Sequence, residues 1–252
     1  MKKFSLILAA AVLLPLQAKA LNITDPFFMP AQGQVVSDTS LGFTNNALKL
    51  NKGWGLYEKI SVGAFDNLTL AASVGWADIK HGGDGMQDIT LHGKYRFMND
   101  ISHGRFLDLD AYFSPELFDS PYNHDGGAAK GSTDFGMYGS VGTAQAADNF
   151  TIGGRFGFDY IGHTDETSSG TVLDAGVFAR YYFNEYNALG LSADLKSYLG
   201  FEKDSFAAAL GVNYSYDVIE DKMAVVPFYS IEVNNKSIPS CAVWGVNARY
   251  LF

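Results

Sequence analysis

Apolar and polar side chains alternate with a period of two residues along most of this 252-residue chain. One clear stretch reads F-T-I-G-G-R-F-G-F-D-Y over residues 150–160. Because side chains of a β-strand point alternately to its two faces, such a stretch predicts a strand with one apolar face. Segments of this kind lie near 33–43, 54–65, 68–78, 88–98, 105–114, 133–145, 150–161, 171–183, 188–198, 205–216, 223–233 and 241–252. The pattern therefore predicts an all-β chain of about twelve strands.

The connections between these segments alternate in length. Connections after even-numbered segments are short to medium, as at Asp66-Asn67 and 184–187. Most connections after odd-numbered segments are longer and rich in Gly, Asp and Ser, as at 115–132. Tight turns at one end and long loops at the other are typical of up-and-down antiparallel strands in an asymmetric setting.

Aromatic residues recur at the turn ends of the even-numbered segments. The pairs are Tyr95 and Phe97, Tyr181 and Phe183, Tyr214 and Tyr216, and Tyr250 and Phe252. Aromatic rings at one level of an apolar face are what a membrane–water interface selects, and the tryptophans Trp54, Trp76 and Trp244 predict a second girdle near the long loops. A sheet in hydrocarbon must have no edge, and an even strand number lets the last strand pair with the first. We therefore expect residues 33–252 to form an up-and-down antiparallel transmembrane β-barrel of about 12 strands.

Two segments precede this region. Residues 1–20 begin Met1-Lys2-Lys3, continue with an apolar run and end in an A-x-A pattern, which predicts a cleaved signal peptide. Residues 21–32 contain Pro26 and Pro30, and proline is poorly tolerated inside a sheet. We expect residues 21–32 to lie either in the lumen as a plug or against the periplasmic rim.

Charge and cysteine content exclude other classes of protein. Without the three lysines of the predicted signal peptide, 15 basic residues face 27 acidic ones, a formal net charge of −12. An acidic surface of this kind argues against nucleic acid as a partner. Cys241 is the single cysteine, so an intramolecular disulfide is excluded. After residue 20 no run of apolar residues is long enough to predict a transmembrane helix.

The ending Ala248-Arg249-Tyr250-Leu251-Phe252 resembles the C-terminal signature of bacterial outer-membrane β-barrels. The resemblance implies residence in the lipid bilayer of the bacterial outer membrane, with the barrel-assembly machinery recognising the C-terminal strand. The stretches 22–28, 37–41 and 93–97 resemble the outer-membrane family named for the meta-pathway of phenol degradation. That resemblance implies passage of small, often aromatic or hydrophobic solutes, and it transfers no binding residue.

The inward face of the predicted barrel carries charges of both signs. In one register Arg96 opposes Asp108 and Lys94 opposes Asp110. A shift of two residues sets Lys94 opposite Asp108 and His92 opposite Asp110. Either register places opposite charges across neighbouring strands. The predicted pore-lining residues are Lys94, Arg96, Asp108, Asp110, Arg155, Asp159, Asp174, Arg180, Asp194, Lys196 and Arg249. We expect these charges either to stiffen the barrel as ion pairs or to form a selectivity constriction.

Catalytic and metal sites are not expected. Asp108-x-Asp110 and His163-x-Asp165 resemble the two catalytic pairs of outer-membrane aspartyl proteases, but the predicted strand order places them at opposite ends, about 25 Å apart. The glycine-rich loop 82–85 lacks the acidic spacing of an EF-hand, and His124 and His163 have no second ligand at metal spacing. We therefore expect no enzyme, no cofactor and no metal.

Two functions remain open at this level. The first is a channel for passive diffusion of small solutes through a lumen of intermediate width. The second is an adhesin or structural barrel that acts through its long loops, above all loop 115–132 with Phe118, Pro121 and Tyr122.

Overall fold

The computed structural model describes residues 21–46, 52–79, 83–100, 103–118, 129, 131–146, 149–164, 168–201, 205–234 and 241–252. The predicted signal peptide, residues 1–20, lies outside these ranges. The strands are β1 (Val35–Asn46), β2 (Gly53–Phe65), β3 (Leu68–Ile79), β4 (Asp84–Met86), β5 (Thr90–Asp100), β6 (Arg105–Ser114), β7 (Asp134–Ala146), β8 (Phe150–Ile161), β9 (Gly170–Tyr182), β10 (Asn187–Leu199), β11 (Ser205–Ile219), β12 (Met223–Asn234) and β13 (Cys241–Leu251). Among the described residues, no helix is both long and apolar enough to cross a membrane.

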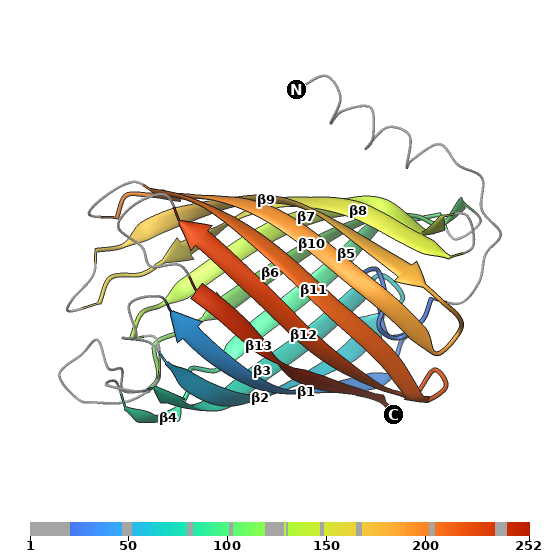
Figure 1. Cartoon of the computed structure of the whole chain (residues 1–252), viewed down its shortest axis with the longest axis horizontal. Helices are drawn as coiled ribbons and strands as arrows, with labels where there is room; N and C mark the ends of the chain where they lie inside the picture. Colours follow the sequence, from blue (N-terminus) through green and yellow to red (C-terminus); the bar gives the residue numbers. More distant parts are fainter. Residues whose placement is uncertain are drawn as a thin grey trace, which may run out of the picture.

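Twelve of these strands close into one antiparallel barrel (Figure 1). Each long strand pairs with its neighbours in sequence, and β1 pairs with both β2 and β13. The pairing of β2 with β3 completes the ring, so the described sheet has no open edge along its long strands. The predicted up-and-down β-barrel of about 12 strands is confirmed.

The seam between the first and last strands explains the aromatic C-terminus. Val36 pairs with Leu251, and the pairing continues without a shift to Asn46 and Cys241. The backbone N–H of Phe252 donates to the carbonyl of Val35 at 2.9 Å. The final strand therefore satisfies its backbone on both sides, as a strand surrounded by hydrocarbon requires.

The outer surface carries the aromatic rings that the sequence pattern predicts. The eight paired aromatics at the short turns are between 37% and 71% exposed: Tyr95, Phe97, Tyr181, Phe183, Tyr214, Tyr216, Tyr250 and Phe252. Three of the pairs meet edge to face, with ring centroids 4.7 to 5.1 Å apart. Toward the other end, Phe43 pairs with both Trp54 and Trp244, and these side chains also face outward. Exposed apolar rings at both ends favour two membrane–water interfaces.

The structure corrects two details of the predicted strands. The stretch expected to be only a glycine-rich loop contains β4, which pairs with Trp76–Asp78 of β3. The next long strand begins at Thr90, two residues later than expected, because residues 87–89 connect it to β4. A shift in pairing between Arg96 and Met98 marks a β-bulge on β5 at Phe97, and periodicity alone does not reveal such an extra residue.

A charged side chain, that of Glu58, interrupts the apolar outward face of β2. Glu58 shares the outer face of β2 with Ile60 and Val62, between apolar neighbours. Its carboxylate accepts hydrogen bonds from the Ser37 hydroxyl at 2.6 Å and the Thr39 hydroxyl at 2.5 Å, both on β1. A polar group that faces lipid needs a hydrogen-bond partner. These two hydroxyls supply it, so a carboxylate is tolerated within the apolar stripe.

Candidate functional site: the barrel lumen

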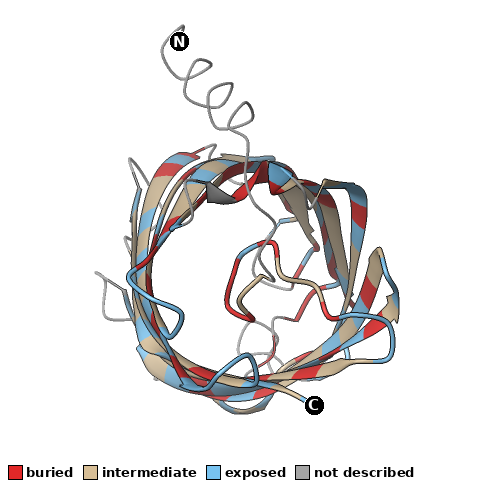
Figure 2. Cartoon of the chain, turned by 90° about the vertical axis from the view of Figure 1, so that its right-hand side faces the viewer, coloured by how far each residue is buried: buried red, intermediate tan, exposed pale blue. Residues whose placement is uncertain are grey.

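The N-terminal segment, residues 21–32, lies inside the barrel near the end with the short turns (Figures 1 and 2). Two turns compact this segment, with the Asp25 N–H donating to the Asn22 carbonyl at 2.8 Å and the Phe28 N–H to the Asp25 carbonyl at 3.0 Å. The chain leaves the lumen at Gly33, whose φ of 82° favours glycine. Beside it, a side chain on Gly63 would meet the Ala31 carbonyl oxygen at 2.1 Å.

Polar side chains of the N-terminal segment bond to neighbouring strands on one side of the barrel. The Asn22 amide donates to Asp217 of β11 at 2.6 Å. The Asp25 carboxylate is 2% exposed and accepts from the hydroxyls of Thr151 on β8, at 2.7 Å, and Tyr182 on β9. These contacts hold the segment against the wall formed by β8 to β11.

Basic residues of the barrel bind oxygen atoms of the same segment. Arg180 donates to the Thr24 hydroxyl at 2.7 Å, and Arg249 donates to the Ile23 carbonyl at 2.6 Å. Arg96 donates to the Phe27 carbonyl. Lys94 donates to the Pro26 carbonyl at 3.3 Å, so four predicted lumen residues bind the N-terminal segment, which the sequence analysis did not anticipate.

An apolar contact fixes the deepest part of the segment. Phe27 is 1% exposed, and its ring stacks on Phe106 with centroids 5.4 Å apart. The ring of Phe178 lies 5.6 Å from Phe27 on another side. Burying an aromatic side chain of this size contributes about 2–3 kcal/mol, so the segment is held by packing as well as by hydrogen bonds.

The first of the two predicted registers between β5 and β6 is the one observed. Arg96 pairs with Asp108 and Lys94 with Asp110 across the two strands. Arg96 donates to the two Asp108 oxygens at 2.7 and 2.8 Å, and the Lys94 ammonium lies 3.1 Å from the same carboxylate. Asp108 thus has two cationic partners, whereas Asp110 keeps its carboxylate toward the lumen.

The remaining predicted charges form clusters farther along the lumen. Arg155 lies 3.0 Å from Asp194 and 3.4 Å from Asp174. Asp159 accepts from the Tyr112 hydroxyl at 2.7 Å and from the Tyr138 hydroxyl. These bonds join β6 through β10 on one side of the interior.

Two further ion pairs use acids that the sequence analysis did not select. Lys196 bonds to Glu232 of β12 at 2.6 Å, and Arg249 bonds to Asp38 of β1 at 2.6 and 3.1 Å. Both acids occupy inward positions of their strands, so the alternation contained the signal. The structure thus brings all eleven predicted residues to the lumen side, while their role in a pore remains a prediction.

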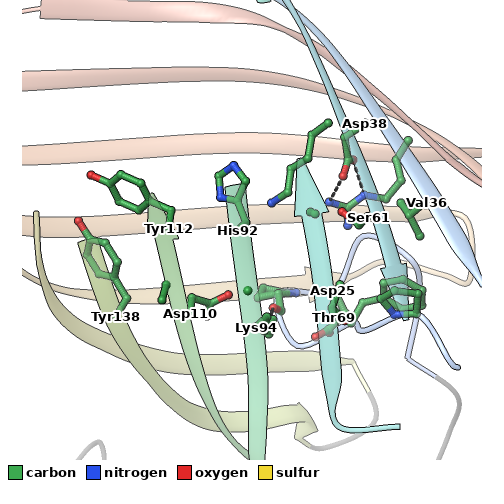
Figure 3. A pocket seen from close by; sticks show the side chains of 18 of the residues that line it. Asp25, Val36, Asp38, Ser61, Thr69, His92, Lys94, Asp110, Tyr112 and Tyr138 are labelled. Atoms are coloured by element: carbon green, nitrogen blue, oxygen red, sulfur yellow. Dashed lines mark hydrogen bonds and ion pairs between the residues drawn. The ribbon is translucent and has the colours of Figure 1, made fainter. Parts of the chain in front are cut away.

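A cavity of about 440 Å³ lies between the N-terminal segment and the wall formed by β1, β2, β3, β5, β6, β7 and β13 (Figure 3). Its polar lining includes Lys59, His92, Asp110 and Tyr112, and Pro26 and Phe28 contribute from the N-terminal segment. The N-terminal segment therefore does not fill the lumen at this level. We call this space the central cavity.

Asp108 and His163, which belong to the two pairs compared with a protease active site, lie at opposite ends of the barrel. Asp108 binds Arg96 near the start of β6, at the short-turn end, and His163 follows the end of β8 at the long-loop end. Asp165 and His124 lie outside the described residues. Among the described residues, no group of three or more His, Cys, Asp or Glu side chains could hold a metal ion.

The loop predicted for an adhesin is described only in part. Phe118 is 37% exposed, and its backbone N–H donates to Asp88 at 3.1 Å. Pro121 and Tyr122 lie outside the described residues, so the adhesin alternative stays a prediction.

No family model and no curated protein matches this chain. Its fold is similar to that of the COG4313 outer membrane channel from Pseudomonas putida F1, with 10% identity, a TM-score of 0.71 and coverage of 92% of this chain and 100% of that one. The KdgM porin in complex with oligogalacturonate gives 12% identity, a TM-score of 0.55 and coverage of 85% and 98%.

The translocator domain of the autotransporter NalP from Neisseria meningitidis gives 12% identity, a TM-score of 0.50 and coverage of 99% and 95%. At such identities the likeness concerns the fold, so this chain has the fold of known outer-membrane β-barrels. The resemblance to the phenol meta-pathway family stays a prediction.

Proposed function

We propose that this protein is a channel of the bacterial outer membrane for passive diffusion of small solutes, with the N-terminal segment narrowing its lumen. One observation carries the proposal: a closed barrel has charged side chains inside, apolar side chains outside and a water-accessible cavity beside the N-terminal segment. Water and small polar molecules can occupy such an interior, whereas the exterior suits hydrocarbon.

Similarity of fold supports the same function. The COG4313 structure, which covers 92% of this chain, is described as an outer membrane channel, and the KdgM structure is described as a porin. By analogy the short turns face the periplasm and the long loops face outward. The C-terminal strand then reaches the periplasmic interface at Phe252, where the barrel-assembly machinery would recognise it.

Ion pairs set the width and the electrostatics of this channel. Arg155 with Asp174 and Asp194, and Lys196 with Glu232, hold side chains against the wall and keep them from closing the interior. Most lumen charges are paired, so the passage suits small polar or amphipathic solutes more than simple ions. The proposal includes the aromatic or hydrophobic solutes that the family resemblance predicts, where such solutes also carry a polar group.

Swelling of liposomes that contain the purified mature chain tests the proposal. The liposomes are transferred to iso-osmotic solutions of arabinose, sucrose and raffinose, and the entry of each sugar is followed by light scattering. We expect entry to fall steeply from the smallest to the largest sugar, because the N-terminal segment leaves only part of the lumen free. If each of the three sugars entered at the same rate as it enters liposomes without protein, the result would contradict a channel.

A further inference from the structure

Two opposite charges face the central cavity without a hydrogen bond or an ion pair to the described part of the chain. Lys59 lies on β2 and Asp110 on β6, both are half-buried, and both line the cavity. Within the described ranges, neither side chain makes a hydrogen bond or an ion pair. Water in the cavity can solvate both groups, so a ligand that displaces this water must replace its bonds to each of them.

The other charges around the cavity are already engaged. Arg249 holds Asp38 through two hydrogen bonds, and Lys94 lies 3.1 Å from Asp108. Asp25 accepts from Thr151 and Tyr182. The charges left for a ligand are therefore one ammonium group and one carboxylate.

The rest of the lining suits a compact apolar body. The hydroxyls of Tyr112 and Tyr138 are both bonded to Asp159, which fixes the two rings on the cavity wall (Figure 3). Pro26 and Phe28 line the side formed by the N-terminal segment. The volume of about 440 Å³ falls in the range of roughly 300–1,000 Å³ typical of small-molecule sites.

We propose that the central cavity is a binding site for small zwitterions of amino-acid size, with the ligand carboxylate on Lys59 and the ligand ammonium on Asp110. The ligand's apolar part lies along the rings of Tyr112 and Tyr138. The inference rests on the proposed function, because it names the substrate class of that channel. A molecule with a single charge leaves either Lys59 or Asp110 desolvated and unpaired, so the cavity discriminates against it.

Isothermal titration of the full mature protein in detergent at neutral pH tests this site with three matched probes. Phenylalanine carries both charges, phenethylamine lacks the carboxylate, and 3-phenylpropionate lacks the ammonium. We expect phenylalanine to bind about tenfold more tightly than either analogue, since each lost charge leaves one protein group unpaired. Equal affinities of the three probes for the wild-type protein would overturn the proposal. So would a lack of phenylalanine binding.

Two variants assign the roles of the two charges. Lys59→Gln lowers the affinity for phenylalanine about tenfold and does not lower the affinity for phenethylamine, which has no carboxylate to pair with Lys59. Asp110→Asn has the same effect on phenylalanine and does not lower the affinity for 3-phenylpropionate, which has no ammonium to pair with Asp110. Lys222→Gln is the matched control, because Lys222 is exposed in the turn between β11 and β12 and does not line the cavity. Phenylalanine binding that both cavity variants leave intact would overturn the assignment.

The titration and the swelling assay fail independently. Sugar entry without a preference for phenylalanine overturns the zwitterion site and leaves the channel standing. A preference for phenylalanine without any sugar entry supports the site and contradicts the channel.

Discussion

Arg96 on β5 and Asp108 on β6 lie directly opposite each other and share two hydrogen bonds, of 2.7 and 2.8 Å, with both side chains withdrawn from water. The guanidinium of Arg96 also lies 4.5 Å from the centroid of the Phe106 ring and donates to the Phe27 carbonyl. One ion pair therefore joins two strands of the wall to the segment inside the lumen.

Replacing Arg96 with Met is expected to lower the free energy of unfolding by about 3 kcal/mol, because the buried Asp108 carboxylate loses its two strongest bonds. Urea unfolding in detergent micelles measures the change. The double variant Arg96→Met with Asp108→Leu is expected to recover most of the loss, since the buried carboxylate is removed with Arg96 and its other partner, Lys94, lines the water-accessible central cavity. A single variant as stable as the wild type would show that the pair contributes little.

Replacing Asp25 with Asn is expected to loosen the N-terminal segment. An amide is a weaker acceptor for the Thr151 and Tyr182 hydroxyls, and the loss of about 1.4 kcal/mol would raise the population of a displaced segment roughly tenfold. Single-channel recordings should then contain more events of large conductance. Asp66→Asn, in the exposed turn between β2 and β3, is the control and should match the wild type.

Replacing Asp110 with Asn is expected to reduce the preference of the pore for cations over anions by roughly twofold, because this carboxylate faces the lumen without a bonded partner. Reversal potentials in a KCl gradient measure the preference. Asp108→Asn serves as the comparison, since Asp108 is compensated by Arg96 and Lys94 and contributes less to the field in the lumen. A larger effect at Asp108 would contradict this assignment.

Replacing Phe252 with Ala is expected to slow assembly more than it lowers the stability of the finished barrel. The Phe252 side chain is 71% exposed and packs on Tyr250 with ring centroids 4.7 Å apart, so its loss opens no cavity in the core. The fraction of folded protein in outer-membrane preparations, seen as heat-modifiable migration on a gel, should fall. Unchanged assembly would contradict recognition of the C-terminal strand.

Strand number and strand orientation follow from the sequence because a two-residue alternation repeats over the whole barrel. The pairing of Arg96 with Asp108 was one of the two registers that the sequence allowed, since a hairpin register restricts which inward side chains can meet. The bulge at Phe97 and the short β4 depend on local backbone geometry within otherwise regular segments, and periodicity does not record them.

The placement of the N-terminal segment was only half predictable. Its prolines argue against a strand, but its position depends on contacts with residues far away in sequence. Asp25 and Tyr182 are separated by 157 positions, and Ile23 and Arg249 by 226. Such contacts form only once the barrel has closed, and so does the central cavity with Lys59 beside it.

The most direct test of the account is a planar-bilayer recording of the purified mature protein. A water-filled lumen narrowed by residues 21–32 predicts discrete conductance steps, with a small main state and rarer large openings that become frequent in Asp25→Asn. A bilayer that stays silent after the folded barrel has inserted would contradict the central claim that this interior is a passage.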